Sequence, residues 1–256
     1  MEAYTGFAEV YDQLMDETPY EQWCKNVIHE LEKYAIRDGL VLDLGCGTGT
    51  LTELLAAKGF DMIGVDCSEE MLNIACEKRV QSGHDILYLN QDMRTFELYG
   101  TVRAVVSVCD SLNYLLEKED LVACFRLVNN YLDPKGIFFF DFNTRYKYES
   151  VIGNSIIAEN REDCSFIWEN YFNPKNGINE YDLTVFVKDK EVSLSSQERF
   201  IRLQEVHLQR GYTIEEMKLL IEDSGLAFVK AYDADTLEEV TDRSERIYCI
   251  AQEKMK

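Results

Sequence analysis

The sequence predicts an α/β protein with a mostly parallel sheet, and two observations lead to this fold class. Short, nearly continuous apolar runs alternate with segments whose apolar residues recur at helical spacing. Strands of this composition are typical of a parallel sheet that helices cover on both faces. The chain has 256 residues, of which 46% are hydrophobic, so it can form one substantial core with an insertion.

The individual elements can be predicted from residue 40 onward. Strands are expected at 40–45, 61–66, 86–92, 102–110 and 137–143, with helices between them at 50–59, 68–79 and 118–132. Ser68 is placed to cap the second of these helices. Nearer the N-terminus, Thr18, Pro19 and Glu21 have the spacing of a cap, a first helical residue and a capping-box acid, which predicts a helix through residue 34.

The pattern changes near residue 150. Three stretches, 155–173, 178–190 and 192–207, alternate apolar and polar residues, which indicates an antiparallel insertion after the fifth strand. The α/β pattern then returns with a helix that Thr213 and Glu216 should begin through a capping box. Two closely spaced strands follow this helix and are expected to pair antiparallel.

The composition argues against large polyanionic partners. The formal net charge of −21 repels nucleic-acid backbones and anionic membrane surfaces. No apolar run is long enough to cross a membrane and no signal peptide is visible, so we expect a cytoplasmic protein. We expect this protein to be a monomer or a homodimer. The eight cysteines include no C-x-x-C pair and the three histidines are far apart, so we expect reduced thiols and no metal site.

The stretch VLDLGCGTGTL, residues 41–51, predicts a ligand-binding loop between a strand and a helix. Such a loop places backbone N–H groups and a helix N-terminus at the carboxyl edge of the sheet, where α/β proteins bind ligands. The glycines are Gly45, Gly47 and Gly49, whereas a dinucleotide fingerprint needs its third glycine at the position of Thr50. A Walker loop is excluded as well, because its Gly-Lys-Ser/Thr ending is absent.

Four motifs, in order, resemble those of the Rossmann-like, class I methyltransferases that depend on S-adenosylmethionine. They are DLGCGTGTL, CSEEML after the second strand, NQDM after the third and CDSLNYLL after the fourth. The similarity extends over residues 38–145 and 210–254, and it includes a bacterial group of small-molecule type whose substrate is unassigned. This resemblance implies a seven-stranded sheet, S-adenosylmethionine as the cofactor, S-adenosylhomocysteine as the product, and no metal.

The resemblance also implies a set of cofactor-binding residues. Asp66 corresponds to the acid that binds the ribose hydroxyls, and Asp92 to the acid that accepts from the adenine amino group. Glycines let the backbone approach a ligand without Cβ clashes, and an ionised carboxylate makes charge-assisted bonds to hydroxyls. The implied residues are Tyr11, Asp43, Gly45, Cys46, Gly47, Gly49, Asp66, Cys67, Met71, Asp92, Met93, Cys109 and Ser111.

The same resemblance places the methyl acceptor above the cofactor, between an N-terminal lid and the insertion. We therefore expect a core of residues 1–150 and 208–256, a helical lid within 1–37, and a substrate-side cap of 151–207. The lid motif FAEVYDQLM makes Tyr11 the first candidate to cover the cofactor, ahead of Tyr4, Phe7 and Trp23. The substrate-binding candidates are Asn113, Tyr114, Asp141, Asn143, Arg145, Trp168, Tyr171, Arg199 and Arg202.

The expected reaction is transfer of a methyl group to a nitrogen or oxygen of a small molecule by in-line displacement. Alignment can supply much of the catalysis, and a base is needed only when the acceptor arrives protonated. Tyr11, Asp110 and His207 are candidates for a catalytic role, and no motif singles out one of them. A methyltransferase acting on a protein or tRNA and a non-catalytic cofactor-binding module are the alternatives, although the N-P-P-Y signature of nucleic-acid enzymes is absent.

Overall fold

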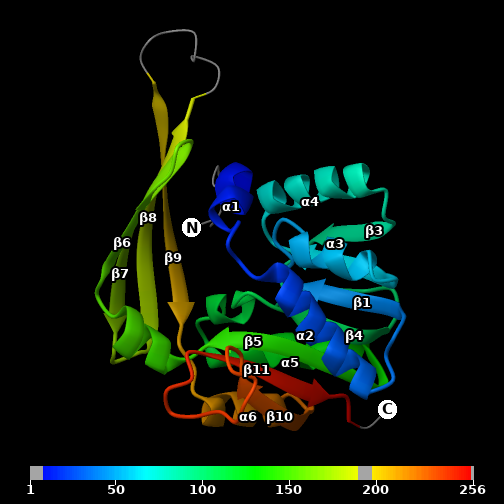
Figure 1. Cartoon of the computed structure of the whole chain (residues 1–256). Helices are drawn as coiled ribbons and strands as arrows, with labels where there is room; N and C mark the ends of the chain where they lie inside the picture. Colours follow the sequence, from blue (N-terminus) through cyan, green and yellow to red (C-terminus); the bar gives the residue numbers. More distant parts are fainter. Residues whose placement is uncertain (1–7, 190–197, 255–256) are drawn as a thin grey trace.

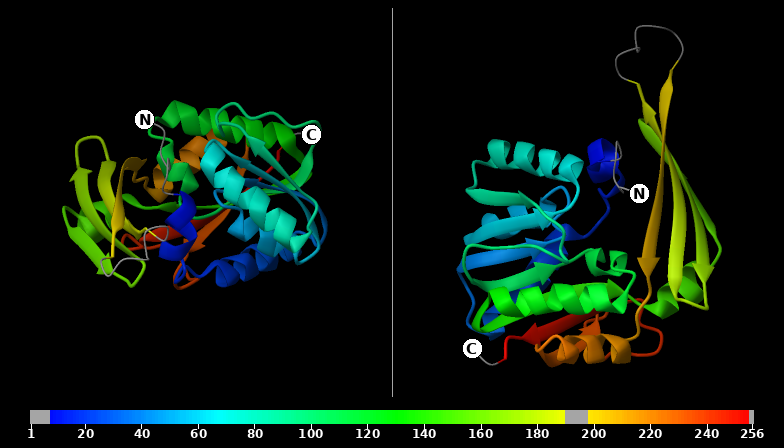
Figure 2. Two further views of the ribbon diagram at one scale, coloured as in Figure 1. Left: turned by 90° about the horizontal axis from the view of Figure 1, so that it is seen from above. Right: turned by 180° about the vertical axis from the view of Figure 1, so that it is seen from behind.

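The computed structural model describes residues 8–189 and 198–254, which form two sheets (Figure 1). A seven-stranded sheet carries helices on both faces, and a four-stranded sheet stands beside it (Figure 2). In spatial order the seven strands are β10 (Ala227–Asp233), β11 (Arg246–Gln252), β5 (Leu132–Asn143), β4 (Val102–Ser107), β1 (Gly39–Leu44), β2 (Phe60–Asp66) and β3 (Ile86–Asn90). Within this sheet β11 alone runs against the other strands, so the mostly parallel fold is confirmed.

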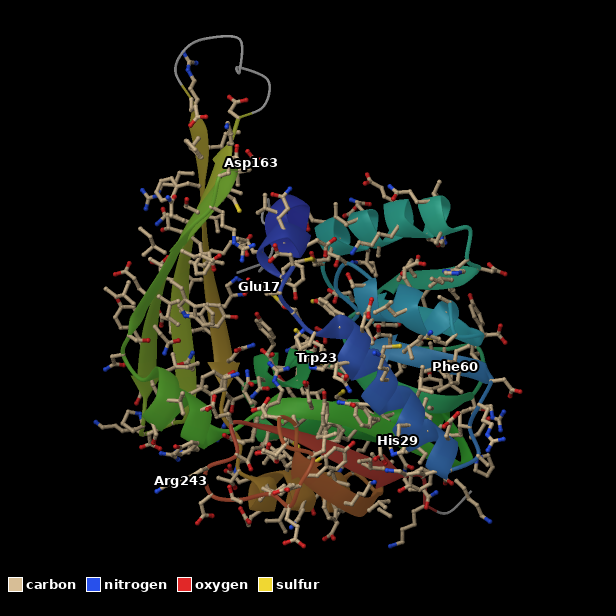
Figure 3. The ribbon with its side chains drawn as sticks, viewed as in Figure 1. Glu17, Trp23, His29, Phe60, Asp163 and Arg243 are labelled. Carbon is tan, nitrogen blue, oxygen red and sulfur yellow. The ribbon has the colours of Figure 1, made fainter. Side chains whose placement is uncertain are left out.

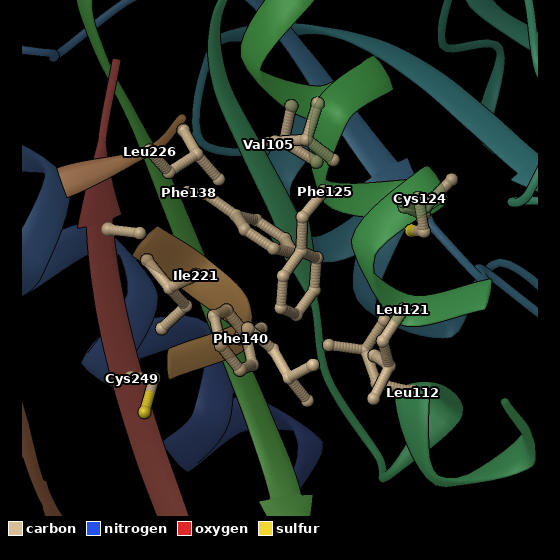
Figure 4. Packing of buried hydrophobic residues seen from close by; sticks show 14 of the residues in the cluster. Val105, Leu112, Leu121, Cys124, Phe125, Phe138, Phe140, Ile221, Leu226 and Cys249 are labelled. Carbon is tan, nitrogen blue, oxygen red and sulfur yellow. The ribbon is translucent and has the colours of Figure 1, made fainter. Parts of the chain in front are cut away.

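Alternate residues of the central strands face two helical layers. On one face, Phe138 and Phe140 of β5 pack against Phe125 of α5 (Lys118–Tyr131), with ring centroids 5.5 and 5.4 Å away (Figure 4). Helix α6 (Ile214–Asp223) contributes to the same core. Phe139 points to the other face, into the core formed with α2 (Tyr20–Lys33) and α3 (Thr50–Ala56). This two-residue period is what a sheet buried on both faces requires.

The second sheet is the predicted antiparallel insertion. Its strands are, in order, β6 (Ile156–Asn160), β7 (Cys164–Asn173), β8 (Ile178–Lys188) and β9 (Phe200–Arg210). Helix α1 (Ala8–Leu14) lies between this sheet and α4 (Glu69–Ser82) (Figure 1). There Val10 of α1, Met71 of α4 and Leu183 of β8 share one apolar cluster, so α1 joins the insertion to the core.

Two predicted helix caps are confirmed. The N–H of Met71 donates to the Ser68 hydroxyl over 3.2 Å at the start of α4. At the start of α6, the Glu216 N–H donates to the Thr213 hydroxyl and the Thr213 N–H donates to the Glu216 carboxylate, which completes the capping box. Local side-chain chemistry therefore fixes where both helices begin.

The predicted cap at Thr18 is wrong. The N–H of Tyr20 donates to the Thr18 carbonyl over 2.8 Å, which makes a tight turn, and α2 begins only after Pro19. The Thr18 hydroxyl instead points to the sulfur of Met15 at 3.6 Å. The turn leaves this hydroxyl without access to the first N–H groups of α2.

The strand boundaries around the insertion also differ from the prediction. Residues 155–173 form two strands, β6 and β7, because the chain turns at 161–163. Strand β9 continues to Arg210, beyond the expected end at residue 207, and leads directly into the core. The fifth strand was expected to begin at residue 137, but β5 begins at Leu132 and its first residues are irregular, with a positive φ of 65° at Lys135.

The described residues contain no helix that could span a membrane, no metal-binding cluster and no disulfide. None of the described helices is long and apolar enough to cross a membrane. Within residues 8–189 and 198–254, no group of three or more metal-binding side chains comes together. The eight cysteines are free in the structure; Cys67 is exposed, and the buried ones are Cys24, Cys124, Cys164 and Cys249.

Candidate active site

A cavity of about 630 Å³ lies at the carboxyl ends of the parallel strands. Its lining follows the strand order, with Asp92 beyond β3, Asp66 at the end of β2, Gly45 after β1 and Cys109 after β4. This edge is where open α/β sheets bind ligands. Its glycine-loop end comprises lining residues within 45–48, 66–71 and 90–94, and its aromatic end comprises Tyr11, Tyr20, Trp23 and Tyr114.

The glycine loop lines the cavity, and its glycines have backbone conformations that other residues rarely adopt. Gly45 and Gly47 have positive φ values of 79° and 54°, and the Gly45 N–H donates to the Val65 carbonyl over 2.8 Å. A Cβ added to Gly45 would lie 2.6 Å from the Cβ of Ser111 in the short helix η1 (Ser111–Tyr114). Only glycine therefore allows the loop and η1 to approach this closely.

Gly49, the third glycine of the loop, is not among the residues that line the cavity. It immediately precedes α3 with a positive φ of 74°. A Cβ at this position would collide with the Tyr88 ring and lie 3.0 Å from the Cβ of Ala75. The third glycine is therefore needed for packing under the loop rather than for contact with the cavity.

Asp66 supports the glycine loop from the end of β2. Its Oδ2 accepts the Gly47 N–H at 2.8 Å and its Oδ1 accepts the Ser68 N–H at 2.9 Å. Burial raises the pKa of Asp66, and these backbone N–H groups oppose that rise. Because each carboxylate oxygen keeps another lone pair, Asp66 can still accept hydrogen bonds from a pair of ribose hydroxyls.

Asp43 lies on the face of β1 that α3 covers. The Thr52 hydroxyl donates to its Oδ2 over 2.6 Å, and the residue is only 2% exposed. Burial, with a smaller contribution from the negative charge of Asp66, raises the pKa of Asp43 to about 7. The charge beneath the glycine loop therefore changes near neutral pH.

Asp92 is paired with Arg94 at the same end of the cavity. The Arg94 Nε lies 2.9 and 3.0 Å from the two carboxylate oxygens, and its backbone N–H donates to Oδ1 over 2.8 Å. The hydrogen bonds from Arg94 lower the pKa of Asp92. Both residues line the cavity. If Asp92 contacts the adenine as predicted, it would do so while paired with the guanidinium of Arg94.

Helix α1 is attached to the glycine-loop end by polar contacts. The Thr48 hydroxyl donates to Oδ1 of Asp12 over 2.7 Å, and the Lys78 Nζ lies 2.7 Å from Oδ2 of the same residue. Lys78 also donates to the Thr50 hydroxyl over 2.7 Å. These contacts connect the lid segment with the loop and with α4.

The opposite side of α1 contacts the insertion. Arg161, in the turn between β6 and β7, lies 2.8 Å from the carboxylate of Asp16 and donates to the Gln13 carbonyl over 2.6 Å. Between the two attachments, Tyr11 lines the cavity, with its hydroxyl 4.0 Å from the sulfur of Cys109. Trp23, at the start of α2, also lines the cavity (Figure 3).

A strained turn follows β4. Cys109 and Asp110 have positive φ values of 73° and 52°, which are uncommon for residues with a side chain and are concentrated at functional sites. Asp141 of β5 accepts the N–H of Asp110 at 2.8 Å and that of Cys109 at 3.3 Å. Arg246 of β11 lies 2.7 Å from Asp141 and 2.6 Å from Asp110, so two distant strands hold this turn in place.

Asp110 and Asp141, two of the candidate residues, are not in the cavity lining. Gln209 donates to the Oδ2 of Asp110 over 2.8 Å, while Arg246 occupies Oδ1. Burial opposes ionisation of Asp110, but the charges of Arg246 and Lys147 outweigh it and lower the pKa of Asp110. Burial raises the pKa of Asp141. We propose that both acids support the strained turn.

Tyr114 connects the cavity with the insertion. Its hydroxyl lies 3.0 Å from Nδ1 of His207 and 2.9 Å from the hydroxyl of Tyr181. The Nε2 of His207 is 3.2 Å from Oε2 of Glu205, and both residues are buried. Tyr181 stacks on His207 with centroids 4.9 Å apart, and Trp168 packs on Tyr181 at 4.6 Å. His207 and Trp168 therefore lie behind Tyr114 and not in the cavity lining.

Asn113 and Asn143 were expected near a substrate but form an internal connection. Asn113 donates to the carbonyls of Asn143 and Arg210 over 2.9 and 2.7 Å, and its side-chain oxygen accepts the Asn143 N–H at 2.9 Å. The Asn143 side chain binds Lys147 and Tyr148. Both asparagines are buried outside the cavity lining, because their amides join η1, β5 and β9.

The remaining candidates among the described residues do not line the cavity. Arg199 and Arg202 are exposed near the β9 end that is distant from the core, and Tyr171 is 52% exposed. Strand alternation explains the outward position of Arg202, because His207 and Glu205 occupy the inward register. Arg145 binds Glu149 and the Pro174 carbonyl outside the cavity lining. Tyr4 and Phe7 lie outside the described residues.

Several cavity residues were not predicted. Some of them lie inside the quoted motifs, at the end of a strand or the start of a helix. That position could have indicated that they face the cavity. Others, such as Tyr20, come from elements that meet the cavity only in three dimensions. The additional lining residues are Tyr20, Thr48, Thr50, Leu51, Val65, Ser68, Glu69, Glu70, Asn90, Gln91, Arg94, Val108 and Leu115.

Known proteins share both this fold and this chain length. Residues 41–136 match the methyltransferase domain family. The protein named “Putative methyltransferase YqeM” from Bacillus subtilis (strain 168) is 38% identical, over 97% of this chain and 96% of that protein. This chain therefore belongs to the bacterial S-adenosylmethionine-dependent methyltransferases, as the four motifs predicted.

A solved structure and a shorter sequence match agree with this family. The crystal structure of a S-adenosylmethionine-dependent methyltransferase from Clostridium acetobutylicum ATCC 824 has a TM-score of 0.86 and 29% identity, and the match covers 97% of this chain and 98% of that one. Over 97 residues, 38% of this chain and 39% of the relative, the identity to the dTDP-3-amino-3,4,6-trideoxy-alpha-D-glucopyranose N,N-dimethyltransferase of Streptomyces venezuelae is 37%.

The residues of the glycine-loop end are suited to S-adenosylmethionine. Asp66 retains lone pairs for hydroxyl groups, and nothing lies within 4 Å of the position that a Cβ of Gly47 would take, so the loop backbone is open to a ligand there. The acids Asp43, Glu69 and Glu70 line the same cavity, which favours a ligand that carries a positive sulfonium. Size, polarity and charge therefore agree with the cofactor of the family.

Proposed function

We propose that this protein transfers a methyl group from S-adenosylmethionine to a nitrogen or oxygen of a small molecule by in-line displacement. The observation that carries the proposal is one cavity that joins the glycine-loop end to the aromatic end. The first end offers backbone and carboxylate groups for a nucleoside, and the second offers aromatic walls for an acceptor. Two ligands can therefore meet at the boundary between the two ends.

The cofactor, when bound, supplies a methyl group on a positively charged sulfur, and its transfer to an acceptor X–H forms a C–X bond, breaks the C–S bond and releases one proton. Asp66 would bind the ribose hydroxyls, and the glycine loop would leave room for the ligand backbone. Asp92 with Arg94 would face the adenine, with Met71 and Met93 as further lining. Tyr11 would cover the reacting groups and exclude water from them.

A small acceptor is supported by the way the cavity is bounded. The N-terminal segment is attached to the glycine loop through Asp12 of α1 and to the insertion through Asp16, which follows α1. We propose that residues 1–37 act as a lid and that the insertion, 151–207, acts as a cap on a core of 1–150 and 208–256. The name of the Streptomyces venezuelae relative describes methylation of a sugar amine, which is an acceptor of this size class.

The test is thermal unfolding with S-adenosylmethionine and with S-adenosylhomocysteine, followed by a screen of amines and hydroxyl compounds in the presence of S-adenosylhomocysteine. At a ligand concentration 100 times the Kd, binding should stabilise the fold by about 2.7 kcal/mol. A further shift with one class of small compound supports the proposal. The absence of a shift with both cofactor forms would contradict it, and a further shift with tRNA alone would replace the small acceptor by a macromolecule.

A further inference from the structure

We infer that Tyr114, His207 and Glu205 form a proton-accepting chain at the aromatic end, so the acceptor is an amine or hydroxyl compound that loses a proton when it is methylated. This inference rests on the proposed methyl transfer and specifies its substrate class. It assigns a chemical role to a connection between η1 and the insertion.

The order of the chain follows from the contacts. Tyr114 lines the cavity, and its hydroxyl lies 3.0 Å from Nδ1 of His207. On the other side of the imidazole, Nε2 lies 3.2 Å from Oε2 of Glu205. The three groups therefore lead from the cavity wall into the insertion sheet, in the order phenol, imidazole and carboxylate.

The surroundings favour one imidazole tautomer. Glu205 is 7% exposed and its Oε2 lies 3.2 Å from Nε2 of His207, so the negative charge of the carboxylate favours the tautomer of a neutral His207 that has its proton on Nε2. Nδ1 is then an acceptor for the Tyr114 hydroxyl. Tyr181 can donate its own hydroxyl to the oxygen of Tyr114 over 2.9 Å, which supports the same direction of donation.

The proton transfer can be written with every proton accounted for. As the bond to the methyl carbon forms, the proton of the acceptor passes to the Tyr114 oxygen, and the Tyr114 proton passes to Nδ1 of His207. His207 becomes an imidazolium, which the Glu205 carboxylate stabilises at Nε2, and it loses the proton to solvent after the product leaves. Tyr114 is the catalytic residue in this scheme, and His207 and Glu205 are positioning residues that act through it.

The arrangement also discriminates between acceptor classes. A thiol that is already ionised needs no base, whereas a hydroxyl or a protonated amine must lose a proton. The charged residues of the cavity lining are mainly acids, with Arg94 paired to Asp92, so a carboxylate acceptor finds no unpaired cation among the described lining residues. Neutral and cationic acceptors are therefore favoured.

The first test is nitrogen NMR of protein labelled with ¹⁵N-histidine. The chain has three histidines, His29, His84 and His207, so comparison with His207→Gln assigns the resonances of the buried ring. The expected result is a neutral His207 with its proton on Nε2, whose Nδ1 signal moves in Tyr114→Phe and whose Nε2 signal moves in Glu205→Gln. A proton fixed on Nδ1, or an imidazolium throughout the pH range of turnover, would overturn the chain.

The second test compares phenol and benzylamine with thiophenol, a thiol that is ionised near neutral pH, by transfer of a radioactive methyl group from S-adenosylmethionine. His207→Gln should lower kcat for the hydroxyl and amine acceptors by about 10²–10⁴-fold, while KM and turnover of the ionised thiol change little. Titratable side chains face His207 from three elements, as Tyr114 of η1, Tyr181 of β8 and Glu205 of β9, so the pH profile of kcat should change in variants of each.

A matched control separates this chemistry from the structural connection. Tyr171→Phe alters an exposed tyrosine of the insertion and should change neither the tautomer nor the ratio of hydroxyl to thiol turnover. Equal losses for hydroxyl and thiol acceptors in His207→Gln would mean that the residue only attaches the insertion. That result would leave the proposed methyl transfer intact. If the wild-type protein did not bind S-adenosylhomocysteine, the proposal of methyl transfer would itself be contradicted.

Discussion

The two ends of the cavity are built in different ways. At the glycine-loop end, backbone groups make the decisive contacts, and the Gly47 and Ser68 N–H groups both donate to Asp66. At the aromatic end, side chains from distant parts of the chain meet, and the hydroxyl of Tyr114 contacts His207, which is 93 residues away. The first end is thus defined by short motifs and the second by the packing of the insertion.

This difference teaches why one ligand is easier to infer than the other. Backbone N–H groups and positive-φ glycines bind the same chemistry in any member of the fold, so their geometry is tied to a local pattern. Side chains on a β insertion can be exchanged without altering the sheet that carries them. The cofactor is therefore indicated by local sequence and the acceptor by tertiary contacts.

The largest expected effect concerns the pH dependence of stability at the glycine-loop end. The pKa of Asp43 is raised to about 7, so the folded state favours its protonated form and loses stability as the pH rises from the unfolded pKa toward 7. A rise from 3.8 to about 7 is about three units, which corresponds to at most about 4 kcal/mol. Asp43→Asn should remove this dependence in denaturant unfolding followed from about pH 5 to about pH 8.

The control for Asp43 is Asp61→Asn on the neighbouring strand. Asp61 is exposed on β2, so its replacement should keep the wild-type pH profile. If Asp43→Asn and the wild type had parallel profiles, burial would not dominate this carboxyl group. The glycine-loop end would then no longer differ from the aromatic end through a buried carboxyl group that makes stability depend on pH.

The next effect tests whether the two ends are energetically separate. Asp66→Ala should weaken S-adenosylhomocysteine binding by about 1.5–3 kcal/mol, the range for hydrogen bonds to a charged group. Asp66→Asn should lose less, because it retains one accepting oxygen for the loop. Titration calorimetry on both variants, with Tyr114→Phe as the aromatic-end control, should show a loss only for the Asp66 changes. An equal loss in Tyr114→Phe would show that the ends bind the cofactor together.

A smaller effect separates backbone strain from contact with the cavity. Gly45 and Gly83 have similar positive φ values of 79° and 73°, so the backbone conformation alone should make alanine cost about 1–2 kcal/mol of stability at either position, and the overlap with Ser111 should add to the cost at Gly45. Only the Gly45 Cβ would meet Ser111, whereas nothing lies within 4 Å of a Cβ on Gly83. Gly45→Ala should therefore also lose cofactor affinity, and Gly83→Ala should not. Calorimetry with S-adenosylhomocysteine and thermal unfolding distinguish the two, and equal affinities would remove the loop from the cofactor site.

The smallest effect concerns how α1 is held between the two regions. Asp12 and Lys78 are partly exposed, so their ion pair should contribute less than about 1 kcal/mol. Asp12→Asn should increase hydrogen exchange in residues 8–14. In the wild-type protein, high salt should also weaken the protection of these residues, because salt screens the ion pair. Asp16→Asn, which alters the contact to Arg161 of the insertion, is the matched variant. A larger change in Asp16→Asn than in Asp12→Asn would show that the insertion, rather than the glycine loop, holds the lid segment.

The sequence by itself determined the order of strands and helices, the family and most of the glycine-loop end. Apolar periodicity predicted a parallel sheet, and the capping box at Thr213 predicted where α6 begins. These features depend on residues close together in the chain, so their physical causes are local. The same reasoning failed at Thr18, where a tight turn from Thr18 to Tyr20 displaced the cap.

Only the tertiary structure decided which side chains reach the aromatic end. Asp110, Asn113 and Asp141, which were candidates on the substrate side, form buried networks with Arg246 and the strand ends. Glu205 had no motif at all, yet strand register places it beside His207 on the inward face of β9. Such positions are fixed by long-range pairing and by the satisfaction of buried polar groups, which no local pattern in the sequence encodes.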